Sequence, residues 1–179
     1  MTTTISNSKI TATINSNGAE LISLKDNKTD KEYMWNGNPD FWAKHSPILF
    51  PIVGTLKNNS YLYNNEEYHL SRHGFARDNV FEIIYQKDNE VVFSLKSNNE
   101  TLQHYPFQFE LQIKYAISEN DLHITYSVFN ENDFQMPFSI GGHPAFALDK
   151  NFENYALEFE ADETLEYYPL ENDLLSNQS

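Results

Sequence analysis

The strict alternation of apolar and polar side chains between residues 107 and 128 constrains the fold of this chain more than any other feature. The apolar positions are Phe107, Phe109, Leu111, Ile113, Tyr115, Leu122, Ile124, Tyr126 and Val128. A spacing of two places all of these side chains on one face of a β-strand. Because the polar run at 118–121 reverses the chain, the two halves are predicted to pair as an antiparallel hairpin.

The same pattern predicts three further hairpins. Their turns lie at 15–18, 64–65 and 87–89, and the first two turns contain the asparagine and glycine residues that reversals favour. The third hairpin places Phe81, Ile83 and Tyr85 on one face. Segments 156–159 and 165–168 are predicted to add two more strands, whereas 99–105 is predicted to form a single helical turn.

A strand with one apolar face buries only that face, so two such sheets must pack against each other. We therefore expect an all-β fold, a large antiparallel β-sandwich. The sequence shows no internal repeat and no linker rich in proline, glycine or serine, so residues 1–179 are predicted to form a single domain.

Charge and cysteine content exclude several classes of function. The chain has 12 Lys and Arg against 26 Asp and Glu, a formal charge of −14, which repels nucleic acid and anionic membranes. There is no cysteine, so disulfides and thiol chemistry are excluded. The apolar run at 47–53 is too short to span a bilayer and the first residues do not resemble a signal peptide, so a cytoplasmic protein is expected.

Three segments interrupt the alternation without being simple turns. Residues 46–54 carry two prolines and are predicted to be an edge or a buried irregular segment. Residues 71–78 contain His73 between arginines, and residues 136–146 contain His143 after two glycines. Histidine titrates near neutral pH, so a pair of histidines suits the two proton transfers that open and close an aldose ring.

These segments carry a resemblance to a known family. The run Arg-His-Gly-Phe-Ala-Arg-Asp at 72–78, followed by Gly-Gly-His-Pro-Ala-Phe at 141–146, resembles the aldose 1-epimerase superfamily, whose members are similar to galactose mutarotase. The runs at 49–54 and 18–21 fit the same pattern, and the closest branch resembles the LacX-type proteins of lactose and galactose operons. The resemblance implies a sandwich of the galactose-mutarotase type with an open sugar cleft, of which this chain is expected to be the N-terminal two-thirds.

The resemblance also implies roles for individual residues. His143 is the implied general acid at the ring oxygen, and His73 positions the sugar or shares the acid role. Arg77 is implied to contact a sugar hydroxyl or phosphate, and Lys57 is the candidate for a further basic sugar contact. No metal and no organic cofactor are implied, and a hexose is the expected ligand. The family's glutamate base is expected later in a longer domain, so this chain alone is predicted to be weakly active or inactive.

Several alternatives stay open at this point. Arg72, Arg77 and Lys57 together would favour a hexose-6-phosphate 1-epimerase, and a non-catalytic carbohydrate-binding relic is the rival from another class. Arg77 and Asp78 also suit a structural ion pair, and a homodimer is allowed. A zinc site at the two histidines lacks the close histidine spacing of known motifs. The remaining histidines are interpreted as structural, namely His45, His69, His104 and His123.

Overall fold

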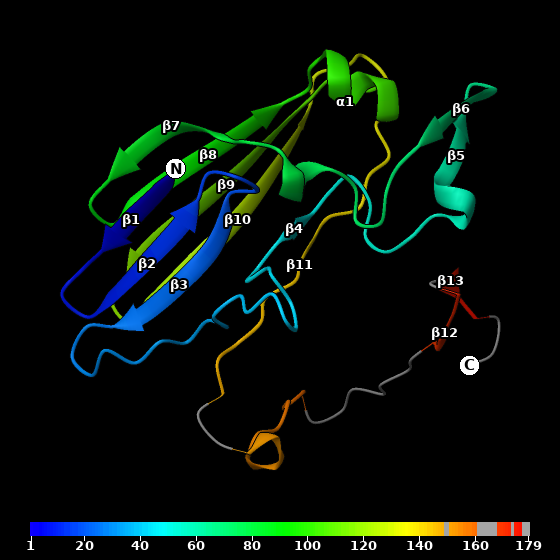
Figure 1. Cartoon of the computed structure of the whole chain (residues 1–179). Helices are drawn as coiled ribbons and strands as arrows, with labels where there is room; N and C mark the ends of the chain where they lie inside the picture. Colours follow the sequence, from blue (N-terminus) through cyan, green and yellow to red (C-terminus); the bar gives the residue numbers. More distant parts are fainter. Residues whose placement is uncertain (149–150, 161–167, 173, 177–179) are drawn as a thin grey trace.

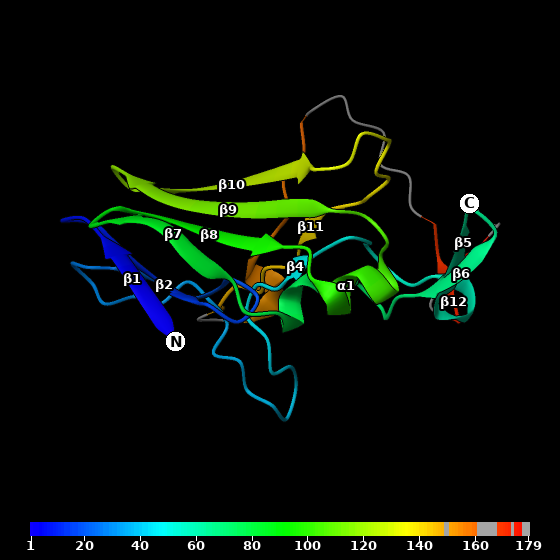
Figure 2. The same cartoon turned by 90° about the horizontal axis from the view of Figure 1, so that it is seen from above.

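Two antiparallel sheets face each other in the computed structural model, which describes residues 1–148, 151–160, 168–172 and 174–176 (Figures 1 and 2). The first sheet has the order β1-β2-β3 and consists of β1 (Thr2–Ser6), β2 (Ile10–Asn15) and β3 (Glu20–Asp26). The second has the order β10-β9-β8-β7 and consists of β7 (Glu82–Lys87), β8 (Glu90–Lys96), β9 (Phe109–Ser118) and β10 (Asp121–Asn130). The predicted all-β class is confirmed.

Short elements connect these sheets and border one end of the sandwich (Figure 1). The two-stranded pairs are β4 (Ile48–Leu49) with β11 (Gly141–Gly142), β5 (Ser60–Tyr63) with β6 (Glu66–His69), and β12 (Leu170–Glu171) with β13 (Leu174–Leu175). The helical turns are η1 (Lys57–Asn59), η2 (Ala76–Asp78), α1 (Asn99–His104) and η3 (Phe152–Asn154). No described helix is long and apolar enough to cross a membrane.

The core forms where the apolar faces of the two sheets meet. In β9 every second residue is buried, and the phenyl rings of Phe107 and Phe109 are fully excluded from solvent. Burial of each such side chain contributes about 1.5–3 kcal/mol. The Tyr115 hydroxyl, also fully buried, donates a 2.7 Å hydrogen bond to the Ala19 carbonyl and so ties the second sheet to the first.

The predicted hairpins are confirmed, and their turns explain why. Asn64 and Asn65 both adopt positive φ angles, of 51° and 65°, as a two-residue turn between twisted strands requires. The predicted helical turn is α1, whose first residues are capped by the Asn98 side chain, which accepts from the amides of Glu100 and Thr101.

Two strand predictions were wrong. A register shift between Ile83 and Tyr85 pairs Tyr85 with Val92, so Tyr85 leaves the face it was predicted to share with Phe81 and is exposed. Residues 156–159 form no strand, because no described segment pairs with them, and the Leu157 side chain lies open to solvent. The further strand predicted at 165–168 falls mostly at 165–167, outside the described residues.

Candidate functional site

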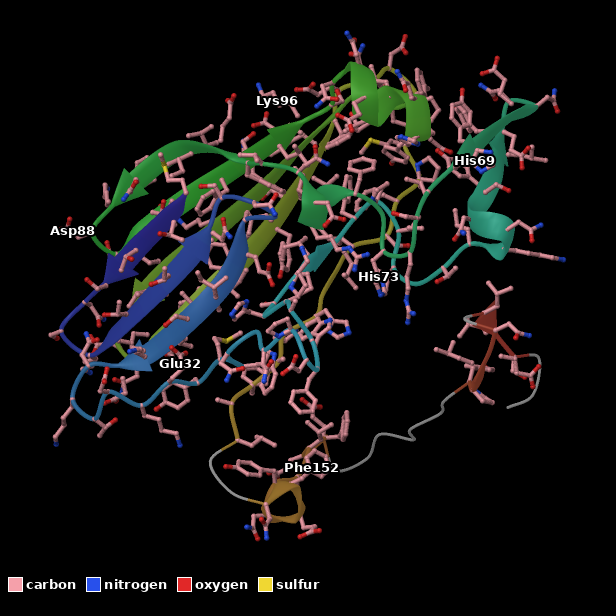
Figure 3. The ribbon with its side chains drawn as sticks, viewed as in Figure 1. Glu32, His69, His73, Asp88, Lys96 and Phe152 are labelled. Carbon is pink, nitrogen blue, oxygen red and sulfur yellow. The ribbon has the colours of Figure 1, made fainter. Side chains whose placement is uncertain are left out.

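The imidazoles of His73 and His143 lie side by side, with ring centroids 6.2 Å apart and ring planes inclined at 64°. His143 follows β11, which pairs with β4, and its amide donates a 3.1 Å hydrogen bond to the Pro47 carbonyl. His73 lies in the link between β6 and η2 (Figure 3). The buried segment 46–51 therefore stands between the two histidine segments, as its prolines predicted for an irregular buried run.

The link that carries His73 is shaped by close backbone contacts. Phe75 and Ala76 both donate from their amides to the Phe50 carbonyl, at 3.0 and 3.1 Å. Gly74 has a φ of 71°, and a Cβ atom there would come within 2.3 Å of the same carbonyl oxygen. Only glycine allows this approach, which holds the link that carries His73 against Phe50.

His73 and Gly54 form a reciprocal pair of hydrogen bonds. The His73 amide donates to the Gly54 carbonyl at 2.8 Å, and the Gly54 amide donates to Nδ1 of His73 at 3.0 Å. An Nδ1 atom that accepts a hydrogen bond carries no proton, so the neutral ring has its proton on Nε2. Nε2 is therefore a hydrogen-bond donor toward any ligand beside the ring.

The surroundings of His73 favour this neutral form. Partial burial lowers the pKa of the His73 imidazole below its ordinary value of 6.5, and the positive charges of Arg77 and Arg72 lower this pKa further, as does His143. At neutral pH His73 thus offers an N–H group rather than a positive charge. This suits contact with a neutral hydroxyl group and not the binding of an anion.

His143 is exposed and has an aromatic neighbour that the sequence analysis missed. The indole of Trp42 lies against it, with ring centroids 5.0 Å apart and planes inclined at 45°. Both tryptophans of the chain, Trp35 and Trp42, fall in the irregular stretch 35–45, where no strand alternation accounts for large aromatic residues. That departure from alternation was the available signal.

A buried carboxylate, also missed, supports the His143 side of the site. Glu20 is 5% exposed, and its Oε1 atom accepts from the amides of His45 and Ser46, at 2.5 and 3.0 Å. These residues lead directly into Pro47, whose carbonyl receives the His143 amide. Glu20 therefore holds the backbone on which His143 rests.

The side chain of Arg77 interacts mainly with residues of its own segment. Its Nη2 atom donates a 2.9 Å hydrogen bond to the Arg72 carbonyl, and its Nε atom lies 3.5 Å from Oδ2 of Asp78. Nζ of Lys44 lies 3.4 Å from the other oxygen of Asp78. The ion pair weighed for Arg77 and Asp78 is thus present, although Arg77 also lies close enough to His73 to affect its charge.

The other candidates lie apart from the histidine pair or make structural contacts. Lys57 is exposed at the start of η1, and no contact in the described part of the chain joins it to either imidazole. Nδ1 of His104 hydrogen-bonds to the His69 carbonyl at 3.0 Å, and His123 is exposed on β10. Among the described residues no three acidic or histidine side chains are placed to hold a metal ion.

Two cavities lie near the site but not at the imidazoles. One, of about 600 Å³, is lined by Ser71, Phe75 and Asp78 on the link that carries His73, together with residues of α1. Another, of about 640 Å³, is mostly apolar and includes Tyr33, Phe146 and Phe152. Neither His73 nor His143 lines either cavity; His143 is exposed to solvent and His73 is half-buried.

Comparison with known proteins points to one family. The sequence model of a family described as Aldose 1-epimerase matches residues 1–176. The plasmid-encoded protein LacX of Lactococcus lactis subsp. lactis is 37% identical over 169 residues, which cover 89% of this chain and 56% of that protein. The chromosomal LacX protein of the same organism is 36% identical over 169 residues, which again cover 89% of this chain and 56% of that protein. The chain thus spans about half the length of the curated relatives it matches.

Two solved structures share the fold. The galactose mutarotase related enzyme of Lactobacillus acidophilus superimposes with a TM-score of 0.90 at 40% identity, covering 98% of this chain and 60% of that one. A galactose mutarotase-like protein from Lactobacillus casei superimposes with a TM-score of 0.82 at 38% identity, covering 86% of this chain and 52% of that one. The predicted galactose-mutarotase type of sandwich is confirmed.

Proposed function

Because the chain belongs to the aldose 1-epimerase family, we propose that it interconverts the α and β anomers of a neutral hexose by acid–base opening of the sugar ring. By family it is an isomerase. The observation that carries the proposal is the 6.2 Å pairing of two imidazoles from distant parts of the chain, both accessible to solvent. The names of the solved relatives refer to galactose mutarotase, so galactose is the first sugar to test.

The proposed reaction needs two proton transfers and no redox step. His143 gives a proton to the ring oxygen while the glutamate base that the family resemblance implies removes the proton of the anomeric hydroxyl. The bond between C1 and the ring oxygen breaks, and the open-chain aldehyde forms. Rotation about C1–C2 and closure on the other face, with both protons returned, gives the second anomer. Correct positioning of acid, base and sugar supplies most of the rate.

The proposed role of His73 follows from its hydrogen bond to Gly54. A neutral ring with its proton on Nε2 donates to a sugar oxygen and so orients the ring relative to His143. Its lowered pKa leaves little protonated ring at neutral pH, which disfavours a role for His73 as a proton donor. Of the two roles left open for His73, positioning is therefore the better supported.

A neutral hexose fits the site better than a hexose phosphate. Arg77, one of the residues that would gather round a phosphate, already donates to the Arg72 carbonyl and lies beside the Asp78 carboxylate. Lys57 has no described contact with the histidine pair. The formal charge of −14 further opposes an anionic substrate.

The proposal includes a cytoplasmic location, with which a cysteine-free sequence is compatible.

Polarimetry tests the proposal directly. Purified residues 1–179 are added to freshly dissolved α-D-galactose, and the decay of optical rotation is compared with that in buffer and with that of galactose 6-phosphate. We expect at most a weak rate above buffer for galactose, in line with the weak activity predicted from the sequence, and a smaller effect for the phosphate. His143→Gln is expected to abolish the protein-dependent part of the rate, because a proton-transfer group usually contributes roughly 10² to 10⁴.

The matched control is His123→Gln, which removes an exposed imidazole from β10, away from the pair. It should leave the rate unchanged. A rate equal to buffer for the unmodified chain, with sugar binding retained, would replace the enzyme proposal with a carbohydrate-binding protein. A rate that His143→Gln does not alter would contradict the assigned acid.

A further inference from the structure

Part of the stretch between β3 and β4 projects away from the two sheets, as the blue-to-cyan segment of Figure 2 shows, although Met34 within the stretch is buried in the core. Residues 35–42 of this stretch contain three large aromatic side chains, Trp35, Phe41 and Trp42. We call residues 35–45 the aromatic loop. Its position is informative because one of its rings contacts the proposed catalytic acid.

Hydrogen bonds at both ends hold the aromatic loop to the His143 segment. The Trp35 amide donates to the Ala145 carbonyl at 2.9 Å, and the Ala145 amide donates to the His45 carbonyl at 2.8 Å. Ala145 lies two residues after His143, so loop and acid share one backbone support. The indole N–H of Trp35 donates to the Trp42 carbonyl at 2.9 Å and closes the loop on itself.

Glycine and glutamate residues complete this support. Gly37 has a φ of 67°, and a Cβ atom there would meet the His45 imidazole at 2.5 Å, so the ring packs directly over the glycine. Oε1 of Glu20 accepts from the amides of His45, the last residue of the loop, and of Ser46, which follows it. The loop is therefore built before any ligand arrives, which reduces the entropy lost on binding.

The aromatic rings of the loop are arranged outward from the acid. Trp42 lies 5.0 Å from His143, and Trp35 meets Phe41 edge to face at 6.3 Å. Phe41 is 80% exposed, so it does not serve the core. Trp42 and His73 are thus both neighbours of the His143 imidazole, with ring centroids 5.0 and 6.2 Å from it.

We propose that the aromatic loop is a carbohydrate-stacking wall, in which Trp42 receives the C–H face of the sugar whose ring oxygen faces His143, and Phe41 extends that wall. The inference rests on the proposed function and identifies a binding surface for it. A pyranose has one face of C–H groups and a rim of hydroxyls. An indole face covers the former, while the Nε2–H of His73 and the imidazole of His143 bind the latter.

The test measures binding without catalysis. Methyl β-D-galactopyranoside has a blocked anomeric oxygen and does not mutarotate, so its binding is independent of turnover. Trp35 and Trp42 are the two tryptophans of the chain, so its tryptophan fluorescence reports on the loop alone. We expect a saturable change in emission as the glycoside is added to residues 1–179.

Three variants test whether Trp42 and Phe41 bind the glycoside. Trp42→Leu and Phe41→Ala should weaken glycoside affinity, measured by calorimetry, by about three- to tenfold, the value of one aromatic contact. Trp42→Phe should restore most of it. Phe152→Ala is the matched control, because Phe152 is 79% exposed and lines a separate cavity (Figure 3). It should leave the affinity unchanged.

Several outcomes overturn the inference. One is no saturable fluorescence change in the unmodified chain. Another is unchanged affinity in Phe41→Ala and in a folded Trp42→Leu variant. If Trp42→Leu fails to fold, Phe41→Ala still decides, because an 80% exposed side chain is not needed for folding. If these variants bind normally while polarimetry shows turnover, the inference fails and the proposed function stands. If the aromatic loop binds sugar but polarimetry shows no turnover, the inference stands and the proposed function fails.

Discussion

The amide N–H of Gly54 donates a 3.0 Å hydrogen bond to Nδ1 of His73, and the His73 amide returns a 2.8 Å bond to the Gly54 carbonyl. Two segments separated by the β5–β6 hairpin are thereby joined at the site, and one ring nitrogen of His73 is permanently occupied. Protonation of that nitrogen would replace the hydrogen bond with a contact between two N–H groups. The site therefore depends on the charge state of a single imidazole.

Acidification should destabilise the protein through His73. Its pKa is lower in the folded chain than its ordinary value of 6.5, so the unfolded chain binds the proton first as the pH falls. The stability that the neutral ring provides is present above about pH 6.5 and is lost as the pH falls through the folded-state pKa. We expect the fall in Tm between pH 7.5 and 5.5 to be smaller in His73→Gln than in the unmodified chain, whereas His123→Gln should keep the full fall.

The same imidazole offers a direct spectroscopic check. The long-range ¹⁵N–¹H spectrum of the ring should show a protonated Nε2 and an unprotonated Nδ1 at pH 7.5. A ring with its proton on Nδ1 would contradict the hydrogen bond to Gly54 and the role assigned to Nε2.

Two glycines beside His73 should respond differently to alanine, although both have positive φ. Gly74 has a φ of 71° and its added Cβ would lie 2.3 Å from the Phe50 oxygen, whereas Gly54 has a φ of 88° and open space around it. Gly54→Ala should therefore cost only the backbone strain of about 1–2 kcal/mol. Gly74→Ala should cost clearly more, since the Phe50 carbonyl must move. Urea denaturation measures both, and equal losses would show that the close approach is not rigid.

Glu20 should be needed for folding stability through its acceptor oxygen. Glu20→Ala leaves the buried amide of Ser46 and the part-buried amide of His45 without their acceptor, and a buried unpaired amide costs about 1–3 kcal/mol. Glu20→Gln keeps an oxygen at this position and should lose less. Glu131→Ala, at an exposed glutamate, should change the free energy of unfolding by no more than about 0.5 kcal/mol. Comparable losses in the alanine and glutamine variants would contradict the acceptor role.

How far the sequence predicts this structure depends on the kind of contact involved. The alternation from Phe107 to Tyr115 predicts a buried strand face because a period of two is a local property, and all those residues are fully buried. The alternation does not predict the face on which Tyr85 lies, because the register shift before Tyr85 depends on pairing with β8. Local patterns thus predict strands and hairpins, whereas departures from the pattern depend on neighbouring strands.

The site was predictable to the extent that its residues interrupt the alternation. His73 and His143 stand in such interruptions, and their proximity was predicted from a resemblance and not from periodicity. Trp42 and Glu20 were missed because their importance comes from contacts with His143 and with the backbone at 45–46. Those contacts join segments far apart in the chain, and no local pattern encodes them.

Arg77 and Lys57 are the two basic residues proposed to contact the sugar. Their alanine variants should differ in the free energy of unfolding. Arg77 donates to the Arg72 carbonyl and lies beside Asp78, so Arg77→Ala should cost about 1.5–3 kcal/mol in the free energy of unfolding, the range for hydrogen bonds to charged groups, and should raise KM. Lys57 is exposed, so Lys57→Ala should leave stability within about 0.5 kcal/mol and change KM alone if it touches the sugar. Urea denaturation with polarimetric kinetics on each variant gives both quantities. An unchanged KM in Lys57→Ala would remove Lys57 from the proposed site, whereas an unchanged stability in Arg77→Ala would show that its contacts within the 72–78 link are replaced by solvent.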